Sequence, residues 1–166
     1  LRGQRRVQGV LDRWVAGELN EQEFLQASDW RKVWNFDPQL YMPLFHFARI
    51  NRIPMLALNV DIDLVRQVGK DGFDKVPAER REGVEKAAPA SEAYLDRLFA
   101  VYAAHPDKQR ALTRNDAEFR RFVEAQQVWD RAMAQAIAGA LSRNPGAQVI
   151  GIMGNGHVIH GHGVEP

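Results

Sequence analysis

The chain has 166 residues, of which 45% are hydrophobic and 26% charged, and its formal net charge is +1. These values are typical of one folded globular domain with a sizeable core, and they argue against a disordered or membrane-spanning chain. A net charge this close to zero creates no general attraction for nucleic acid, so we expect no nucleic-acid partner. The absence of cysteine excludes disulfides and thiolate metal ligands.

Helical spacing of apolar residues begins near the start of the chain. It predicts a first helix over residues 4–17 and a short second helix opened by Asn20, with Glu23 in the capping-box position. Asp37 followed by Pro38 is a typical helix start and predicts a third helix.

Two apolar runs have the length and composition of buried strands. They cover residues 53–60 and 148–153, and between them lie the amphipathic patterns of helices at 91–104 and about 115–142. Helix and strand in this order predict an α/β fold, a mostly parallel sheet sandwiched by helices, with an inserted helical lobe at about 70–142.

We expect residues 1–166 to form a single domain that is a fragment of a longer protein. The chain begins at Leu1 without a methionine and is already in helical spacing there. Two strands are too few for a stable open sheet. The missing N-terminal strand or strands are therefore expected outside this fragment, in a partner chain, or in segments whose pattern misleads.

The tail of the chain carries the strongest functional signal. Three of the five histidines, His157, His160 and His162, fall within the glycine-rich run 154–163 that follows the second apolar run. Imidazole binds transition metals and moves protons near neutral pH, and glycine lets the backbone approach a ligand closely. We favour a divalent-metal or cofactor site here over the alternative, a flexible loop, although no cysteine or nearby carboxylate completes a set of four zinc ligands.

Polar residues elsewhere are expected to contribute to the same site. Asn59 ends the first apolar run, and a parallel sheet would place it beside His157; capping of the following helix is an equal alternative. Gln126 and Asp130 fall on or beside the apolar stripe of the long helix. A buried Asp130 needs a partner, either a tail imidazole that it orients through the ring N–H or a cation such as Arg97.

Aromatic and histidine side chains on the helices are candidate axial ligands of haem iron. Tyr41, Tyr94 and Tyr102 lie on helices rich in aromatics, where core packing is the default, and His105 follows the predicted helix 91–104. Tyrosine and histidine both serve as axial ligands to haem.

The order of several short motifs resembles the ChaN-like proteins, bacterial haem-binding lipoproteins of the haem-binding uptake and Tiki-like grouping. The matching stretches include Leu11-Asp12-Arg13-Trp14, Trp34-Asn35-Phe36-Asp37, Ala57-Leu58-Asn59-Val60, Trp129-Asp130 and Gly154-Asn155-Gly156-His157-Val158. The family's opening strand, with its Gly-Glu-x-His-type motif, has no counterpart in this chain.

The resemblance implies a haem-binding protein of bacterial iron or haem uptake, non-enzymatic, with haem binding linked to formation of a homodimer. It also implies a membrane-anchored lipoprotein of the cell envelope, in the periplasm or at the outer membrane, that works with outer-membrane uptake machinery. Cations near the helical lobe, among them Lys108, Arg110 and Arg114, are expected to meet the haem propionates.

Two other functions stay open at this point. One is a Tiki-like metal-dependent hydrolase, since Gly154-Asn155-Gly156-His157 matches the second of the paired Gly-x-x-His motifs of those relatives. The other is a structural domain whose tail is only a glycine-rich loop. Metal analysis and haemin titration separate the three.

Overall fold

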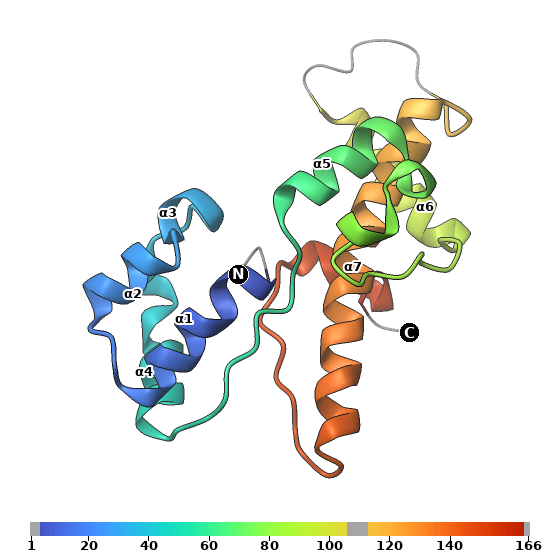
Figure 1. Cartoon of the computed structure of the whole chain (residues 1–166). Coiled ribbons are helices and arrows are strands. Elements are labelled where there is room, and N and C mark those ends of the chain that lie inside the picture. The colour runs from blue at the N-terminus through green and yellow to red at the C-terminus, as the bar shows by residue number, and fades with distance from the viewer. Residues whose placement is uncertain (1–3, 106–112, 165–166) are drawn as a thin grey trace. The chain divides into compact units, whose positions relative to one another are not determined.

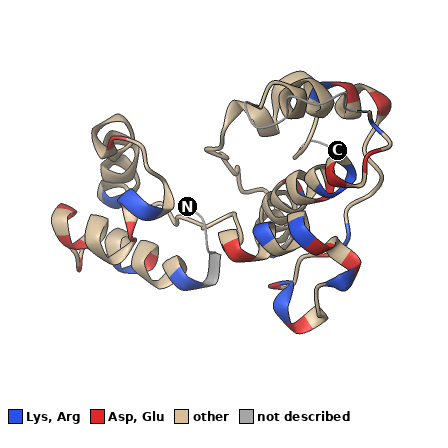
Figure 2. Cartoon of the chain, turned by 90° about the horizontal axis from the view of Figure 1, so that it is seen from above, with Lys and Arg blue, Asp and Glu red and all other residues tan. Residues whose placement is uncertain are grey.

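The computed structural model describes residues 4–105 and 113–164, and these residues form helices joined by turns and extended segments (Figure 1). The chain divides into two compact units, Leu1–Asp61 and Ile62–Pro166. In both units acidic and basic side chains alternate along the helices instead of gathering by sign (Figure 2). No described helix combines the length and the apolar character needed to cross a lipid bilayer.

The first unit is a set of helices around an aromatic core. Its elements are α1 (Gln4–Ala16), α2 (Glu21–Ala27), α3 (Trp30–Val33), the 3-10 turn η1 (Pro38–Leu40) and α4 (Met42–Ile50). Trp14, Phe24 and Trp30 are completely buried, and Trp14 Nε1 donates a hydrogen bond to the Phe45 carbonyl at 2.9 Å. Burial of such large rings supplies the main stabilisation of this unit.

Local signals set where these helices begin and end. The predicted capping box is present, because Asn20 Oδ1 accepts from Glu23 N at 2.9 Å while Glu23 Oε2 accepts from Asn20 N at 2.8 Å. Gly17, at φ +84°, ends α1 in the left-handed region that glycine favours. The helix predicted after Asp37 is split, since η1 ends before α4 begins.

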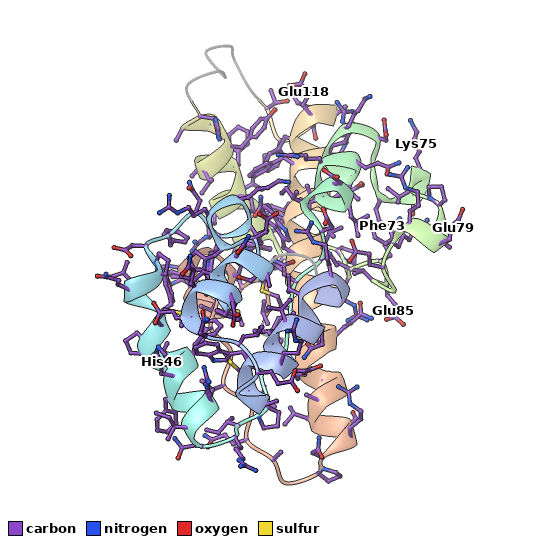
Figure 3. All side chains as sticks on the ribbon, turned by 60° about the vertical axis from the view of Figure 1, so that its left-hand side comes forward. His46, Phe73, Lys75, Glu79, Glu85 and Glu118 are labelled. Carbon is purple, nitrogen blue, oxygen red and sulfur yellow. The ribbon has the colours of Figure 1, made fainter. Side chains whose placement is uncertain are left out.

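The second unit is built along one long helix. Its elements are α5 (Ile62–Asp71), η2 (Phe73–Lys75), η3 (Ala78–Arg80), α6 (Glu92–Ala103), α7 (Ala117–Arg143), η4 (Asn155–His157) and η5 (Ile159–Gly161). Both α5 and α6 pack against α7. Figure 3 labels Phe73 and Glu85 beside this helix and Glu118 in its first turn.

Side chains of α7 also hold the irregular segment between α5 and α6. Glu124 Oε2 accepts from the Phe73 backbone N at 2.7 Å, and Gln127 Nε2 donates to the Ala88 carbonyl at 2.7 Å. Long polar side chains thus satisfy backbone groups that have no helix or sheet partner. Helix α7 begins after Asp116, whose side chain makes no capping bond to the helix.

The predicted α/β sandwich with a mostly parallel sheet is wrong, because none of residues 4–105 and 113–164 is in a β-strand. The run 53–60 is extended, but its backbone is bound by a side chain. Gln8 Nε2 donates to the Met55 carbonyl at 2.9 Å, and Ala57 N donates to Gln8 Oε1 at 3.0 Å. An apolar run becomes a strand only when a neighbouring strand completes its ladder, and one glutamine amide replaces that neighbour here.

The second apolar run, 148–153, is likewise extended and unpaired in the described structure. Ile150 is 80% exposed, so this run does not enter a core within the described residues. Its apolar composition fits a buried strand and an unpaired extended segment equally well, because hydrophobicity carries no information about hydrogen-bonding partners.

Candidate functional site

The candidate site is centred on Asp130, a buried carboxylate in the middle of α7. Its residue surface is 4% exposed, and both of its oxygens have a partner. The Tyr94 hydroxyl donates to Oδ2 at 2.6 Å, and His157 Nδ1 lies 2.7 Å from Oδ1. A carboxylate removed from water is tolerated only with such partners, so Asp130 connects α6, α7 and the tail through short hydrogen bonds.

Tyr94 reaches Asp130 from the first turn of α6. Ser91 caps this helix and its Oγ accepts from Tyr94 N at 3.2 Å, which fixes the tyrosine's backbone. Burial and then the hydrogen bond to Asp130 raise the pKa of the Tyr94 phenol above its ordinary value, while the nearby Arg97 opposes this shift. The phenol therefore stays protonated and acts as the donor to the carboxylate.

The tail folds back on itself to place His157 against Asp130. His157 N donates to the Gly154 carbonyl at 3.0 Å, and Val164 N donates to the His157 carbonyl at 2.9 Å. Gly163 adopts φ +85°, and a Cβ built on it would lie 2.5 Å from His157 O and 3.1 Å from Asp130 Oδ1. Glycine is required at this position because the chain passes through a contact that leaves no room for a side chain.

His157 presents one ring nitrogen for binding. Its Nδ1 is engaged by Asp130, and the Trp129 ring meets the imidazole edge-on at 5.9 Å between centroids. The His157 side chain is 20% exposed, and its Nε2 makes no hydrogen bond to any residue that the structure describes. A histidine held by a carboxylate at Nδ1 and open at Nε2 is the common arrangement of a metal-ligating imidazole.

The other two tail histidines lie near Tyr94 and differ in their surroundings. His162 stacks on the Tyr94 ring, with 5.5 Å between centroids and 25° between planes. His160 is exposed in the left-handed region at φ 61°, and its ring centroid lies 6.3 Å from that of His162. Within residues 4–105 and 113–164 no three histidine, cysteine or acidic side chains are grouped to hold one metal ion. The three-histidine metal site predicted for the tail therefore stays a prediction.

A family model described as haem-binding uptake, Tiki superfamily, ChaN matches residues 4–166. This chain belongs to that family. The match confirms the resemblance drawn from the ordered motifs and extends over nearly the whole chain. Searches of curated proteins and of solved structures find no match.

The donor set around Asp130 fits the haem that the family implies. Haem iron takes an axial nitrogen from histidine, and the porphyrin requires apolar and aromatic surroundings. His157 offers an oriented imidazole, and Trp129, Val158 and Ile159 are partly buried beside it.

Other predicted ligands have different partners. Tyr102 is buried on α6, and its hydroxyl donates to Glu118 Oε2 at 3.2 Å. His105 is exposed just after α6. Gln126 is half-buried one turn before Asp130 on α7. None of these three is joined to Asp130 or His157 by a hydrogen bond between described residues.

Tyr41 and Asn59 belong to the first unit. The Tyr41 ring packs 4.5 Å from that of Trp34, within the aromatic core. Asn59 Oδ1 accepts from the adjacent Val60 N at 2.9 Å, a local bond close to the start of α5. The predicted neighbourhood of Asn59 and His157 stays a prediction.

Of the three cations expected to meet the haem propionates, the structure describes Arg114. Arg114 pairs with Glu92 at 2.9 Å and with Asp96, so its charge is already neutralised. Lys108 and Arg110 lie outside the described residues. Arg97 lies one turn beyond Tyr94 on α6 and acts electrostatically on its phenol, and no ion pair joins it to another residue that the structure describes.

The sequence offers a tail imidazole as one of two alternative partners of Asp130, but it does not indicate Tyr94 as the second donor to the carboxylate. Tyr94 was assigned to packing or to axial ligation, and its true contact is the carboxylate. Asp130 itself indicates that a second donor is needed. Two carboxylate oxygens on an apolar helix face require two donors, and a tail histidine supplies one of them.

Proposed function

We propose that the chain is a non-enzymatic haem-binding protein of bacterial haem or iron uptake, in which His157 Nε2 would hold the haem iron. The observation that carries this proposal is the 2.7 Å contact between His157 Nδ1 and the buried Asp130. The contact selects the tautomer with hydrogen on Nδ1, which leaves the Nε2 lone pair free to bind iron.

The surrounding residues have distinct tasks in this proposal. Haem, when bound, supplies an iron centre that accepts an axial nitrogen. Trp129 restricts the rotation of the His157 ring by its edge-on contact, and Asp130 increases the basicity of Nε2. The positive charge of Arg97 is available for one propionate.

Haemin titration of the full chain, followed at the Soret band, tests the proposal. We expect His157→Ala to abolish the spectral change of the wild type and Asp130→Asn to weaken haemin binding by about 10–100-fold, the usual effect of removing a partner behind a metal-bound histidine. His46→Ala is the matched control, because His46 is a half-exposed helix residue whose Nε2 meets Glu21 at 3.0 Å in the other unit. Unchanged haemin binding by His157→Ala would refute the assignment.

Metal analysis of the same samples distinguishes the hydrolase. Stoichiometric zinc or manganese that is lost in His157→Ala, together with no Soret band in the wild type, would replace haem binding with a metal-dependent activity. A Soret band without bound zinc or manganese supports the proposal.

The proposal includes a homodimer located in the cell envelope, as implied by the family. An apolar face of α4 supports a protein contact, because Phe47 is 60% exposed and Ile50 is 78% exposed. Sedimentation velocity with and without haemin is expected to show a dimer that Phe47→Glu disrupts. A monomer under both conditions would remove this part of the proposal. Fractionation of the source bacterium is expected to recover the protein, together with uptake machinery, in the envelope.

A further inference from the structure

The unusual feature of the site is that one carboxylate serves two donors of different kinds. Asp130 Oδ2 accepts from the Tyr94 phenol at 2.6 Å, and Oδ1 lies 2.7 Å from His157 Nδ1. A pairing of His157 with Asp130 alone would account for the orientation of the ring. The second, equally short bond to a buried tyrosine requires a separate explanation.

We propose that Tyr94 is a positioning residue that limits how strongly Asp130 draws on the His157 proton, and thereby raises the reduction potential of iron bound at His157. The inference rests on the proposed function, since it requires iron at Nε2. It adds a residue that does not contact the iron and assigns it control over the balance between ferric and ferrous haem.

The physical basis is competition for the charge of a single carboxylate. Each donor that binds Asp130 stabilises part of its negative charge and weakens its attraction for the other donor. Asp130 is 4% exposed, so water does not replace a lost partner easily. Without the phenol, the carboxylate binds the Nδ1 proton of His157 more strongly, and the ring takes on more imidazolate character. A more basic axial ligand favours the ferric state and lowers the potential.

The position of Tyr94 fits this role better than packing alone. Ser91 fixes its backbone at the start of α6, and His162 stacks on its ring at 5.5 Å between centroids. These contacts keep the hydroxyl directed at Asp130. Arg97 is the other charge beside the phenol. It partly offsets the rise in the pKa of Tyr94, but it does not replace the hydrogen bond to the carboxylate.

Tyr94→Phe in the full haem-loaded protein tests the inference by redox titration. The variant keeps the ring and its stacking but removes the donor, so we expect a more negative midpoint potential and a higher iron–histidine stretching frequency in the ferrous resonance Raman spectrum. Asp130→Asn is expected to shift both measurements in the opposite direction. Tyr102→Phe is the matched comparison, because it removes a 3.2 Å phenol-to-carboxylate bond from the same helix without touching Asp130.

A second measurement covers the case in which Tyr94→Phe does not fold. Replacement of all three tyrosines by 3-fluorotyrosine strengthens the phenol as a donor, and we expect a more positive potential. The result is attributed to Tyr94 when it persists in a variant that carries both Tyr41→Phe and Tyr102→Phe, so that Tyr94 is the tyrosine that remains.

The outcomes separate this inference from the proposed function. Loss of the Soret band in His157→Ala, with equal potentials for wild type and Tyr94→Phe, would overturn the role of Tyr94 alone. A Soret band retained in His157→Ala, or lost in Tyr102→Phe, would overturn the ligand assignment and this inference with it. Opposite shifts of potential for Tyr94→Phe and Asp130→Asn, with none for Tyr102→Phe, support it.

Discussion

Gly163 is where the tail passes closest to the buried carboxylate, and its replacement by alanine tests the geometry of the site directly. The new Cβ would lie 2.5 Å from His157 O and 3.1 Å from Asp130 Oδ1. Both distances are below the roughly 3.5–4.0 Å at which non-bonded atoms attract each other. Gly163→Ala must therefore displace His157 from Asp130 or force the tail off the helices.

Gly146 offers a control that separates this clash from backbone strain. It has φ +91°, similar to +85° at Gly163, but a Cβ there meets nothing within 4 Å. An alanine held in the left-handed conformation lowers the free energy of unfolding by about 1–2 kcal/mol, and this cost is common to both variants. Overpacking adds about 1–3 kcal/mol at Gly163 only. If the tail detaches locally, this extra loss is smaller, but the contact between His157 and Asp130 is then broken.

Two measurements are therefore needed, one of the stability of the whole chain and one of the site itself. Urea unfolding compares the free energies of the two variants, and haemin titration compares their affinities. We expect haemin affinity at least about tenfold weaker for Gly163→Ala than for Gly146→Ala, as for loss of a partner behind a ligating histidine. Equal haemin affinities, together with unchanged imidazole nitrogen NMR signals of His157, would refute the tail geometry on which the site is built.

Three further outcomes are expected. Burial and the bond to Asp130 raise the pKa of Tyr94, so the folded state keeps a proton that the unfolded chain loses above pH about 10. The free energy of unfolding of the wild type should therefore fall with rising pH by up to about 1.4 kcal/mol per pH unit relative to Tyr94→Phe. Urea unfolding at a series of pH values measures this difference, and parallel curves would contradict the expectation. Trp14→Phe should lower the free energy of unfolding by about 2–4 kcal/mol, because it opens a cavity and leaves the Phe45 carbonyl without its donor; a loss below about 0.5 kcal/mol in urea unfolding would count against this core. Asn20→Ala should cost about 1 kcal/mol in thermal unfolding and Asn20→Ser nearly nothing, and equal losses would show that the cap is not the cause.

Helices were predictable here because their signals are local. The capping box at Asn20, the glycine stop at residue 17 and the amphipathic stripe of α7 each lie within a few residues of the structure that they specify. The strands failed for the opposite reason. A strand depends on a partner distant in sequence. Nothing in the run 53–60 indicates that the Gln8 side chain forms hydrogen bonds with its backbone.

The candidate site was half predictable by the same logic. An aspartate beside the apolar stripe of a helix demands partners, and a tail with three histidines offers one, so the contact between Asp130 and a tail imidazole was among the expected pairings. The choice of His157 over its neighbours depends on the turn closed by the Val164 N bond to the His157 carbonyl, which no spacing rule reveals. The role of Tyr94 was not predictable, because a buried tyrosine on an aromatic helix is as consistent with core packing as with a hydrogen bond to a carboxylate.

The buried carboxylate makes ordering of the tail and assembly of the site a single event. The tail has few apolar contacts of its own, since Ile150 and Ile152 are exposed, and its last turns are held by polar bonds. Detachment of His157 removes one of the two donors to Asp130, and a hydrogen bond to a charged group contributes about 1.5–3 kcal/mol. That penalty discourages an open tail even without ligand, so the imidazole is oriented before haem arrives. Affinity gained in this way comes from preorganisation, and it is lost when either Asp130 or the glycine turn is changed.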